Sequence, residues 1–411
     1  MTDVPDSRLP ARAWLIVGLL SVVACLNYLD RVMLTTMRES LTRAIPMTDA
    51  QFGLLTSTFL WVYGALSPFA GFLADRFRRS RVIIGSLFLW SLTTWLTSHA
   101  TTVNQLLVTR ALMGMSEACY LPAALALIAD YHRGPTRSLA TGLHLCGLSI
   151  GAGLGGLGGW LAERHGWSYA FTIFGSVGVV YSLLLLFTLR DAPRQAGAHS
   201  ASTEKVAFLA ALRSLSSRGS FWLMFFYWGL IGLAGWGVIG WMPTYLQKQF
   251  HLGQGEAGFT ATSYLQITTL AGLILGGLWA DRWSRATERG RIHVAVIGMC
   301  LAGPAILLVA STHTFAIAIA GLMLFGLARG ISDSNTMPIL CLVCDPRYRA
   351  TGFGVLNFFS CAVGGFTIYA GGVLRDADVN VRQVFIVAAI GLLMCAGLLA
   401  LIKPMNSKLP R

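Results

Sequence analysis

Long apolar runs restrict the fold of this chain more than any other sequence feature. Spanning a bilayer takes about 20 mostly apolar residues per helix, and twelve stretches of that kind follow one another along the chain. Of the 411 residues, 55% are hydrophobic and only 12% are charged, so polar side chains are too few to coat soluble domains of this size. The sequence therefore predicts an all-α polytopic membrane protein.

The apolar runs form two groups of six. The predicted helices of the first group cover residues 13–37, 51–74, 81–98, 104–130, 138–161 and 167–189. Those of the second group cover residues 220–247, 258–280, 292–311, 314–342, 351–373 and 383–402. The polar stretch between the groups divides the chain into an N-terminal bundle (1–189), a cytoplasmic linker (190–219) and a C-terminal bundle (220–411). Helical spacing of apolar residues predicts a short amphipathic helix at 206–215.

The net charge of +13 comes from short basic clusters rather than from a basic surface. One cluster contains Arg76, Arg78, Arg79 and Arg81, and it lies between two apolar runs, as in the cytoplasmic loops of membrane proteins. With the N-terminus inside, most Lys and Arg residues fall on the cytoplasmic side. We therefore expect a multi-pass protein of the plasma (inner) membrane, with both termini cytoplasmic and no nucleic-acid partner. The first apolar run is predicted to be a retained helix, not a signal peptide.

An internal repeat relates the two groups. The segment after the second predicted helix reads GFLADRFRRSR, and the segment after the eighth reads GLWADRWSRATER. The matching pairs are Gly71 with Gly277, Asp75 with Asp281, and Arg76 with Arg282. Duplication of a six-helix unit explains this spacing and predicts two pseudo-symmetric bundles.

The repeated loop resembles the signature loop of the major facilitator superfamily, with Arg78 where that family usually has Gly. The resemblance implies a twelve-helix fold, alternating access around a midplane cavity, and a monomer in the lipid bilayer. It also implies gating roles for four residues of the repeat: Asp75, Arg76, Asp281 and Arg282.

Ionisable side chains inside the predicted helices are the main functional candidates, because a charge facing lipid is costly. They are Asp30, Arg31, Arg110, Glu117, Arg329 and Asp333. Arg110 and Glu117 share one face of the fourth helix, about two turns apart. Arg329 and Asp333 are one turn apart on the tenth helix and can touch, either as a structural ion pair or as part of a second substrate site.

The four charged residues within the first six predicted helices belong to a wider sequence pattern. The motif N-Y-x-D-R on the first helix, a Tyr on the second and R-x6-E on the fourth resemble the anion:cation symporter branch, which includes hexuronate, galactonate and organic-anion transporters. That resemblance implies that Arg31 and Tyr63 contact a substrate carboxylate and that Asp30 and Glu117 carry protons. Because Asp30 and Arg31 are adjacent, they should point about 100° apart, toward different neighbours.

A coupling hypothesis follows from charge pairing on the fourth helix. Ionised Glu117 would partly neutralise Arg110, and protonation of Glu117 would free that positive charge for an anion. Anion and proton would then stabilise one another in the cavity, which is the basis of symport. Tyr28 and Trp61 are expected to frame the site. Asn335 and Asn357 are candidates either for substrate hydroxyls or for hydrogen bonds between helices.

Other motifs point to packing rather than chemistry. Four glycines recur every four residues on the fifth predicted helix and favour a close helix contact: Gly147, Gly151, Gly155 and Gly159. Cys341 and Cys344 form a C-x-x-C without a second pair, so no metal site is expected. For His144, a structural role as a hydrogen-bonded histidine is the first interpretation, and a role as proton carrier is the alternative. No Walker loop, zinc-protease motif or nucleophile elbow is present, and we expect no enzyme and no cofactor.

The sequence predicts a secondary transporter that uses the proton gradient to take up a small anionic substrate, such as a sugar acid or another carboxylate. Three alternatives stay open: a spinster-type exporter of lipids or amphiphiles, an anion exchanger, and a membrane receptor that transports nothing.

Overall fold

The structure is a computed structural model that describes residues 11–132, 136–192, 208–345 and 348–404, without the side chains of residues 71–75, 208–210 and 350. The described part is helical and contains no strand. Its first half consists of α1 (Ala11–Thr36), α2 (Arg38–Ala44), α3 (Asp49–Arg76), α4 (Arg79–Thr97), α5 (Val103–Ala118), α6 (Tyr120–Tyr131), α7 (Arg137–Leu154), α8 (Gly156–His165) and α9 (Trp167–Thr188).

The second half consists of α10 (Phe208–Ser216), α11 (Gly219–Phe250), α12 (Gln254–Phe259), the π-helical turn η1 (Thr260–Tyr264), α13 (Leu265–Ser284), α14 (Gly290–Ser311), α15 (Phe315–Val343), α16 (Arg349–Asp376) and α17 (Arg382–Leu401). The predicted short helix is present as α10. Most of the predicted linker, residues 193–207, lies outside the described residues.

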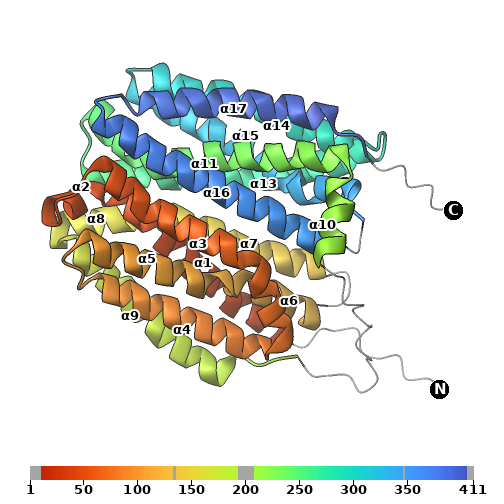
Figure 1. Ribbon diagram of the computed structural model, residues 1–411, viewed down its shortest axis with the longest axis horizontal. Helices are drawn as coiled ribbons and strands as arrows, with labels where there is room; N and C mark the ends of the chain where they lie inside the picture. The colour runs from red at the N-terminus through yellow and green to blue at the C-terminus, as the bar shows by residue number, and fades with distance from the viewer. Residues whose placement is uncertain (1–10, 133–135, 193–207, 346–347, 405–411) are drawn as a thin grey trace.

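Two helical bundles lie side by side, α1–α9 in one and α11–α17 in the other (Figure 1). Among the described helices, eleven segments are long and apolar enough to cross a membrane. The predicted third span, residues 81–98, is occupied by α4, which packs along α9. This helix carries several Ser and Thr residues and is therefore less apolar than those eleven segments. The all-α polytopic fold predicted from the sequence is confirmed.

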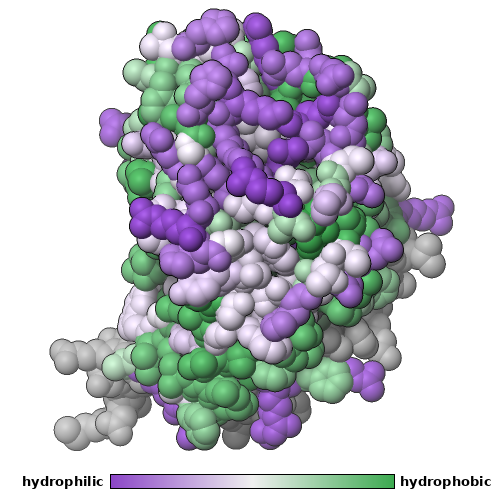
Figure 2. Space-filling model, turned by 90° about the vertical axis from the view of Figure 1, so that its left-hand side faces the viewer, coloured by the Kyte–Doolittle hydropathy of each residue, from purple (hydrophilic) through white to green (hydrophobic). Residues whose placement is uncertain are grey.

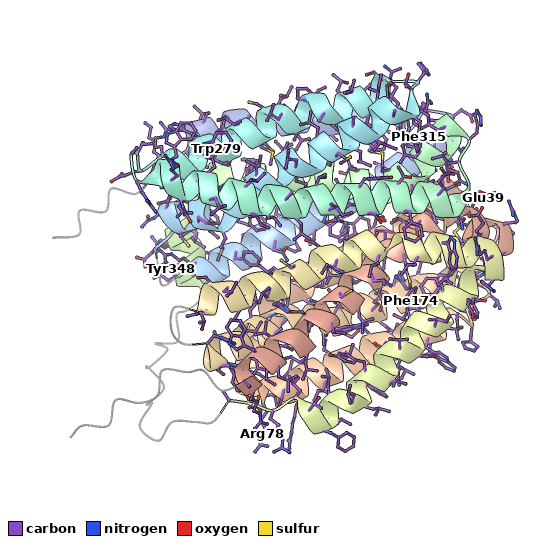
Figure 3. The ribbon with its side chains drawn as sticks, turned by 180° about the vertical axis from the view of Figure 1, so that it is seen from behind. Glu39, Arg78, Phe174, Trp279, Phe315 and Tyr348 are labelled. Atoms are coloured by element: carbon purple, nitrogen blue, oxygen red, sulfur yellow. The ribbon has the colours of Figure 1, made fainter. Side chains whose placement is uncertain are left out.

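The two ends of the bundles differ. Arg78 and Tyr348 lie at one end, called the Arg78 end below, and Glu39 and Phe315 lie at the opposite end, called the Glu39 end (Figure 3). Hydrophilic side chains gather over the upper half of the Glu39 end (Figure 2).

Glycines let α7 and α8 approach α1 closely. A Cβ at Gly147 would collide with the carbonyl oxygen of Ser21, and one at Gly151 would collide with that of Cys25. Further along, the Thr36 hydroxyl donates to the carbonyl of Gly155 at 3.0 Å. The close helix contact predicted from the four-residue glycine spacing is therefore confirmed.

The bundles meet along a seam formed by α3 and α16. The Ser57 hydroxyl donates to the carbonyl oxygen of Gly365 at 2.6 Å, and the Trp61 indole donates to that of Ala362 at 3.1 Å. A second junction joins α7 and α8 to α12, η1 and α13, where Thr262 and Ser263 both donate to the carbonyl of Gly153. The two junctions hold the bundles together along opposite sides of the core.

Candidate functional site

A buried guanidinium lies on α1 of the N-terminal bundle. Arg31, on α1, donates from Nε to Oε2 of Glu117, on α5, at 2.6 Å. Three aromatic rings surround the same guanidinium, with centroids at 4.9 Å for Tyr28, 5.0 Å for Phe59 and 4.3 Å for Tyr63. Cation–π attraction and the ion pair together offset the cost of burying this charge. These five residues are called the Arg31 cage.

Asp30 points away from the cage, as expected from its position next to Arg31. Its Oδ2 accepts a hydrogen bond from the Thr94 hydroxyl on α4 at 3.3 Å, while Oδ1 has no partner among the described residues. Arg110 interacts electrostatically with Asp30 and Glu117, and its guanidinium lies 5.4 Å from the ring centroid of Phe171. Its Nε and Nη2 lack hydrogen-bond partners in the described part of the chain.

The pairing of Glu117 differs from the coupling hypothesis. We expected Glu117 to neutralise Arg110 at least in part, and its hydrogen-bonded partner is Arg31 instead. The physical reason is distance along the helix: seven residues separate Arg110 from Glu117, about 10 Å of axial rise. Arg31 approaches Glu117 directly from the facing helix. The four charges therefore form one buried group. Within it, Arg110 is the cation with two nitrogens that lack hydrogen-bond partners among the described residues.

The charged pair of the second half is separate from this group. Arg329 donates from Nε to Oδ2 of Asp333 at 3.2 Å within α15, so the predicted contact is confirmed. The guanidinium packs beside Gly235 on α11, where a Cβ would crowd it. Its nearest partner is thus on its own helix, and its surroundings belong to the C-terminal bundle.

The remaining substrate candidates lie in helix contacts. The Trp61 indole is bonded to Ala362 in the α3–α16 seam. Asn357 donates to the Ser67 hydroxyl across the same seam at 3.4 Å. Asn335 donates to the carbonyl of Ile331 at 3.0 Å within its own helix, and its Oδ1 has no partner among the described residues. In this conformation the structure brings none of the three into the Arg31 cage.

The four predicted gating residues lie at or near the Arg78 end. The side chain of Asp75 lies outside the described residues. Arg76 and Arg282 are exposed, and Asp281 accepts a hydrogen bond from Arg291 at 2.6 Å.

Sequence analysis missed a charged network at the Glu39 end. Asp49, at the start of α3, accepts from Arg38 Nε at 2.7 Å and from Arg375 Nε, on α16, at 2.8 Å. Asp376 accepts from the backbone N–H groups of Asp49 and Ala50 at 2.7 and 2.9 Å. Burial lowers the pKa of Arg38, and the Asp49 carboxylate opposes that shift. This network, called the Asp49 clasp, ties the bundles together across the Glu39 end.

The clasp has no distinctive signal in the sequence. Asp49 and Asp376 stand at the boundaries of apolar runs, where charges are ordinary, so their position alone did not mark them as functional.

Phe59, in the Arg31 cage, had a helical-spacing signal in the sequence, because it lies one helical turn before Tyr63 and therefore on the same face.

The secondary candidates are His144 and the C-x-x-C cysteines. His144 is buried against Tyr120, with ring centroids 5.9 Å apart, and neither ring nitrogen has a partner in the described part of the chain. Cys341 and Cys344 are free thiols. No group of three metal-ligating side chains occurs within the described residues.

Comparison with known proteins places this geometry in context. The family model described as Major Facilitator Superfamily matches residues 20–369. An MFS-type efflux pump of Mycolicibacterium smegmatis is 27% identical over 92% of this chain and 87% of its own length. A probable sulfoacetate transporter of Cupriavidus necator is 27% identical over 86% of this chain and 87% of its own. Human protein spinster homolog 1 is 28% identical, covering 66% of this chain and 54% of that protein.

A solved structure has the same fold. The crystal structure of a bacterial homolog to the human lysosomal transporter spinster, in an inward-facing and unoccupied conformation, superposes with a TM-score of 0.81 at 22% identity, covering 96% of this chain and 97% of that one.

Proposed function

The chain belongs to the Major Facilitator Superfamily, and we propose that it is a proton-coupled secondary transporter of a small organic anion, working by alternating access. The family and the fold are those of membrane transporters, not of enzymes. The proposed substrate class is a sugar acid or another carboxylate, taken up as a symport with protons. A proton gradient supplies the energy, and no cofactor takes part.

The Arg31 cage is the single observation that carries this proposal. A planar guanidinium suits a substrate carboxylate, but here its hydrogen-bonding edge is held by Glu117. Two ionised carboxylates at one buried guanidinium would repel each other. A substrate anion can therefore replace Glu117 at Arg31 once Glu117 is protonated. Anion and proton binding then favour each other, and this reciprocity is thermodynamic coupling.

The rest of the buried group extends the site. Arg110, with two nitrogens lacking partners among the described residues, is the proposed second contact for the anion. Asp30, with one oxygen similarly unpartnered, is the proposed second proton carrier. Tyr28 and Tyr63 supply the aromatic walls of the substrate site.

Orientation follows from the distribution of basic residues. We propose that the Arg78 end is cytoplasmic, with both termini on that side of the plasma (inner) membrane. The Asp49 clasp is then a closed outer gate. Asp75, Arg76, Asp281 and Arg282 would regulate closure at the cytoplasmic end in the opposite half of the cycle.

A second candidate function is export of an amphiphilic anion, favoured by the similarity to an efflux pump and to spinster homologs. The same guanidinium would bind a phosphate or sulfonate head group. Anion exchange without net proton movement is the third mode that this site could support.

One transport experiment separates these functions. Proteoliposomes containing the full chain are offered a labelled panel of sugar acids, short carboxylates, a sulfonate and a lysophospholipid, with and without an inward proton gradient. Gradient-stimulated uptake of a hydrophilic anion supports symport. Movement of the lysophospholipid alone would overturn symport of a sugar acid in favour of amphiphile export. Gradient-independent exchange would overturn proton coupling.

A further inference from the structure

A groove on the outside of the N-terminal bundle is separate from the Arg31 cage. It has a volume of about 820 Å³, within the usual range of ligand pockets, and lies between α4 and α5 beside the end of α3. Leu89, Leu112 and Met115 line it and are 55%, 41% and 43% exposed, so the groove opens sideways, toward lipid.

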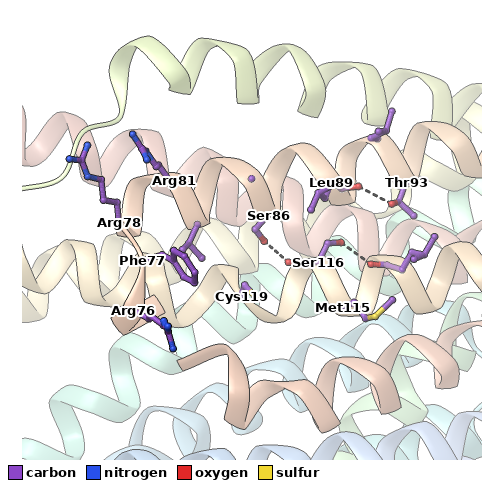
Figure 4. Close-up of a pocket in the computed structure, with 14 residues that line it drawn as sticks. Arg76, Phe77, Arg78, Arg81, Ser86, Leu89, Thr93, Met115, Ser116 and Cys119 are labelled. Carbon is purple, nitrogen blue, oxygen red and sulfur yellow. Dashed lines mark hydrogen bonds between the residues drawn. The ribbon is translucent and has the colours of Figure 1, made fainter. Parts of the chain in front are cut away.

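Polar side chains inside the groove are already satisfied. Ser86 donates to the carbonyl oxygen of Ser116, Ser116 to that of Leu112, and Thr93 to that of Leu89, as the dashed lines in Figure 4 show. The wall therefore presents hydrocarbon to an occupant rather than free hydrogen-bonding groups. Such a wall suits an acyl chain and does not suit a sugar or a peptide backbone.

The Arg78 end of the groove is strongly basic. Arg76, Arg78 and Arg81 gather around it together with Phe77 (Figure 4). All three arginines are exposed, and none takes part in the ion pairs found among the described residues. Their neighbour Arg79 differs, because it is paired with Asp130. Three cations at the mouth of an apolar groove complement an anionic head group joined to a hydrocarbon chain.

The dimensions agree with one leaflet of a bilayer. From Arg81 to Thr93, α4 rises about 18 Å at about 1.5 Å per residue, and half of the hydrocarbon core of a bilayer is about 15 Å thick. A head group at the arginines therefore places its acyl chain alongside the groove for most of the leaflet.

We propose that this groove binds an anionic phospholipid, with the head-group phosphate between Arg76, Arg78 and Arg81 and one acyl chain between α4 and α5. The site rests on membrane insertion alone and not on the transported substrate.

Binding of fluorescent phosphatidylglycerol to the purified full chain, in neutral-detergent micelles, tests the head-group half of the site. The double variant Arg78→Gln/Arg81→Gln should weaken binding about 25-fold, since each basic residue near an anionic lipid contributes about fivefold. The matched control is Arg137→Gln/Arg285→Gln, which removes two exposed arginines outside the groove and should change binding less than twofold. Equal effects of the two double variants would reduce the site to general surface charge and overturn it.

A second variant tests the acyl half without touching charge. Gly85 lines the groove, and a Cβ there meets nothing within 4 Å, so Gly85→Leu adds an apolar side chain to the groove from an open position. It should weaken phosphatidylglycerol binding at least fivefold, whereas Gly397→Leu, at an equally open position on α17, should not. Unchanged binding in Gly85→Leu would overturn the proposal.

Three competitors identify the source of the anionic group. Unlabelled phosphatidylglycerol should displace the probe, whereas inorganic phosphate and phosphatidylcholine should not do so at matched concentrations. Displacement by phosphate alone, or equal displacement by phosphatidylcholine, would also overturn the proposal. Size-exclusion profiles of each variant show whether it is folded.

Discussion

At the scale of single residues, the chemistry depends on which carboxylate Arg31 holds. Arg31 and Glu117 are both buried, and their bond crosses from α1 to α5. Losing one partner of a buried pair is costly, so Glu117 can release Arg31 only when another anion takes its place. Proton binding and substrate binding can be linked because Arg31 exchanges the Glu117 carboxylate for the substrate anion. A charge inside the membrane would not by itself provide this link.

Replacing Glu117 by Gln separates coupling from binding. Gln keeps an oxygen that accepts the hydrogen bond from Arg31 but never carries a charge. We expect Glu117→Gln to lose gradient-driven accumulation by at least tenfold while keeping substrate counterflow within about threefold of wild type, measured in proteoliposomes. The control is Glu288→Gln, an exposed residue, which should retain both activities. Wild-type accumulation by Glu117→Gln would refute the coupling role.

Replacing Arg31 by Lys tests the geometry of anion binding. Lys keeps the charge but loses the planar fork of donors. One charge-assisted hydrogen bond contributes about 1.5–3 kcal/mol, so the apparent affinity for the anion should fall about 10- to 100-fold. The substrate concentration for half-maximal counterflow measures this effect. An unchanged value would show that Arg31 does not contact the anion.

The residues of the buried group could be located from the sequence, but their pairing could not. A charge in an apolar run is visible without a structure, which is why Asp30, Arg31, Arg110 and Glu117 were identified. Partner choice depends on the register of α1 against α5, and that register is set by tertiary packing. Thr94 was invisible for the same reason, since it is one of several Thr residues on α4.

At the scale of helices, close contacts decide which surfaces are fixed. The glycines of α7 bring it against the backbone of α1, which carries Asp30 and Arg31. At the Glu39 end, Asp49 joins α3 to α2 and α16 through two arginines. The first contact lies within one bundle and should persist through the cycle, whereas the second crosses between bundles and must break if that end opens.

The glycine contact can be tested by two substitutions on one helix. Gly151→Leu forces a side chain against the backbone of Cys25, whereas a Cβ at Gly142 meets nothing within 4 Å, so Gly142→Leu starts from an open position. Overpacking costs typically about 1–3 kcal/mol, so the unfolding temperature of Gly151→Leu in detergent should drop by several degrees. Gly142→Leu should unfold within about a degree of wild type. Equal unfolding temperatures would show that α1 and α7 are not held this closely.

The Asp49 clasp can be opened by Asp49→Asn. Two partly buried arginines, Arg38 and Arg375, would then lose their shared carboxylate. A loss on the order of 2 kcal/mol, between the values for surface and buried pairs, would shift the population of the closed end about 30-fold.

Distances between spin labels at Ala44 and His251, two exposed positions at the Glu39 end, measure this opening with the exposed Cys300 replaced. The long-distance population should grow in Asp49→Asn and stay unchanged in the control Glu288→Gln, which removes an exposed charge outside the clasp. An unaltered distribution in Asp49→Asn would exclude the clasp as a gate.

At the scale of the whole molecule, composition and hydropathy were enough to predict the architecture. Apolar length predicts spans, and the repeated loop predicts two related halves, because both depend only on local sequence. The contacts across the seam could not be predicted in the same way. Ser57 with Gly365 and Asn357 with Ser67 join segments that are far apart in the chain, and neither has a local signal.

Luminal pH in proteoliposomes loaded with a pH-sensitive dye tests proton-coupled anion uptake most directly. The transported anion identified from the panel is added outside at equal pH on both sides, with the membrane potential clamped. Symport predicts acidification of the lumen that depends on the anion and is abolished in Glu117→Gln. Anion entry without a pH change, or with alkalinisation, would contradict proton symport through the Arg31–Glu117 pair.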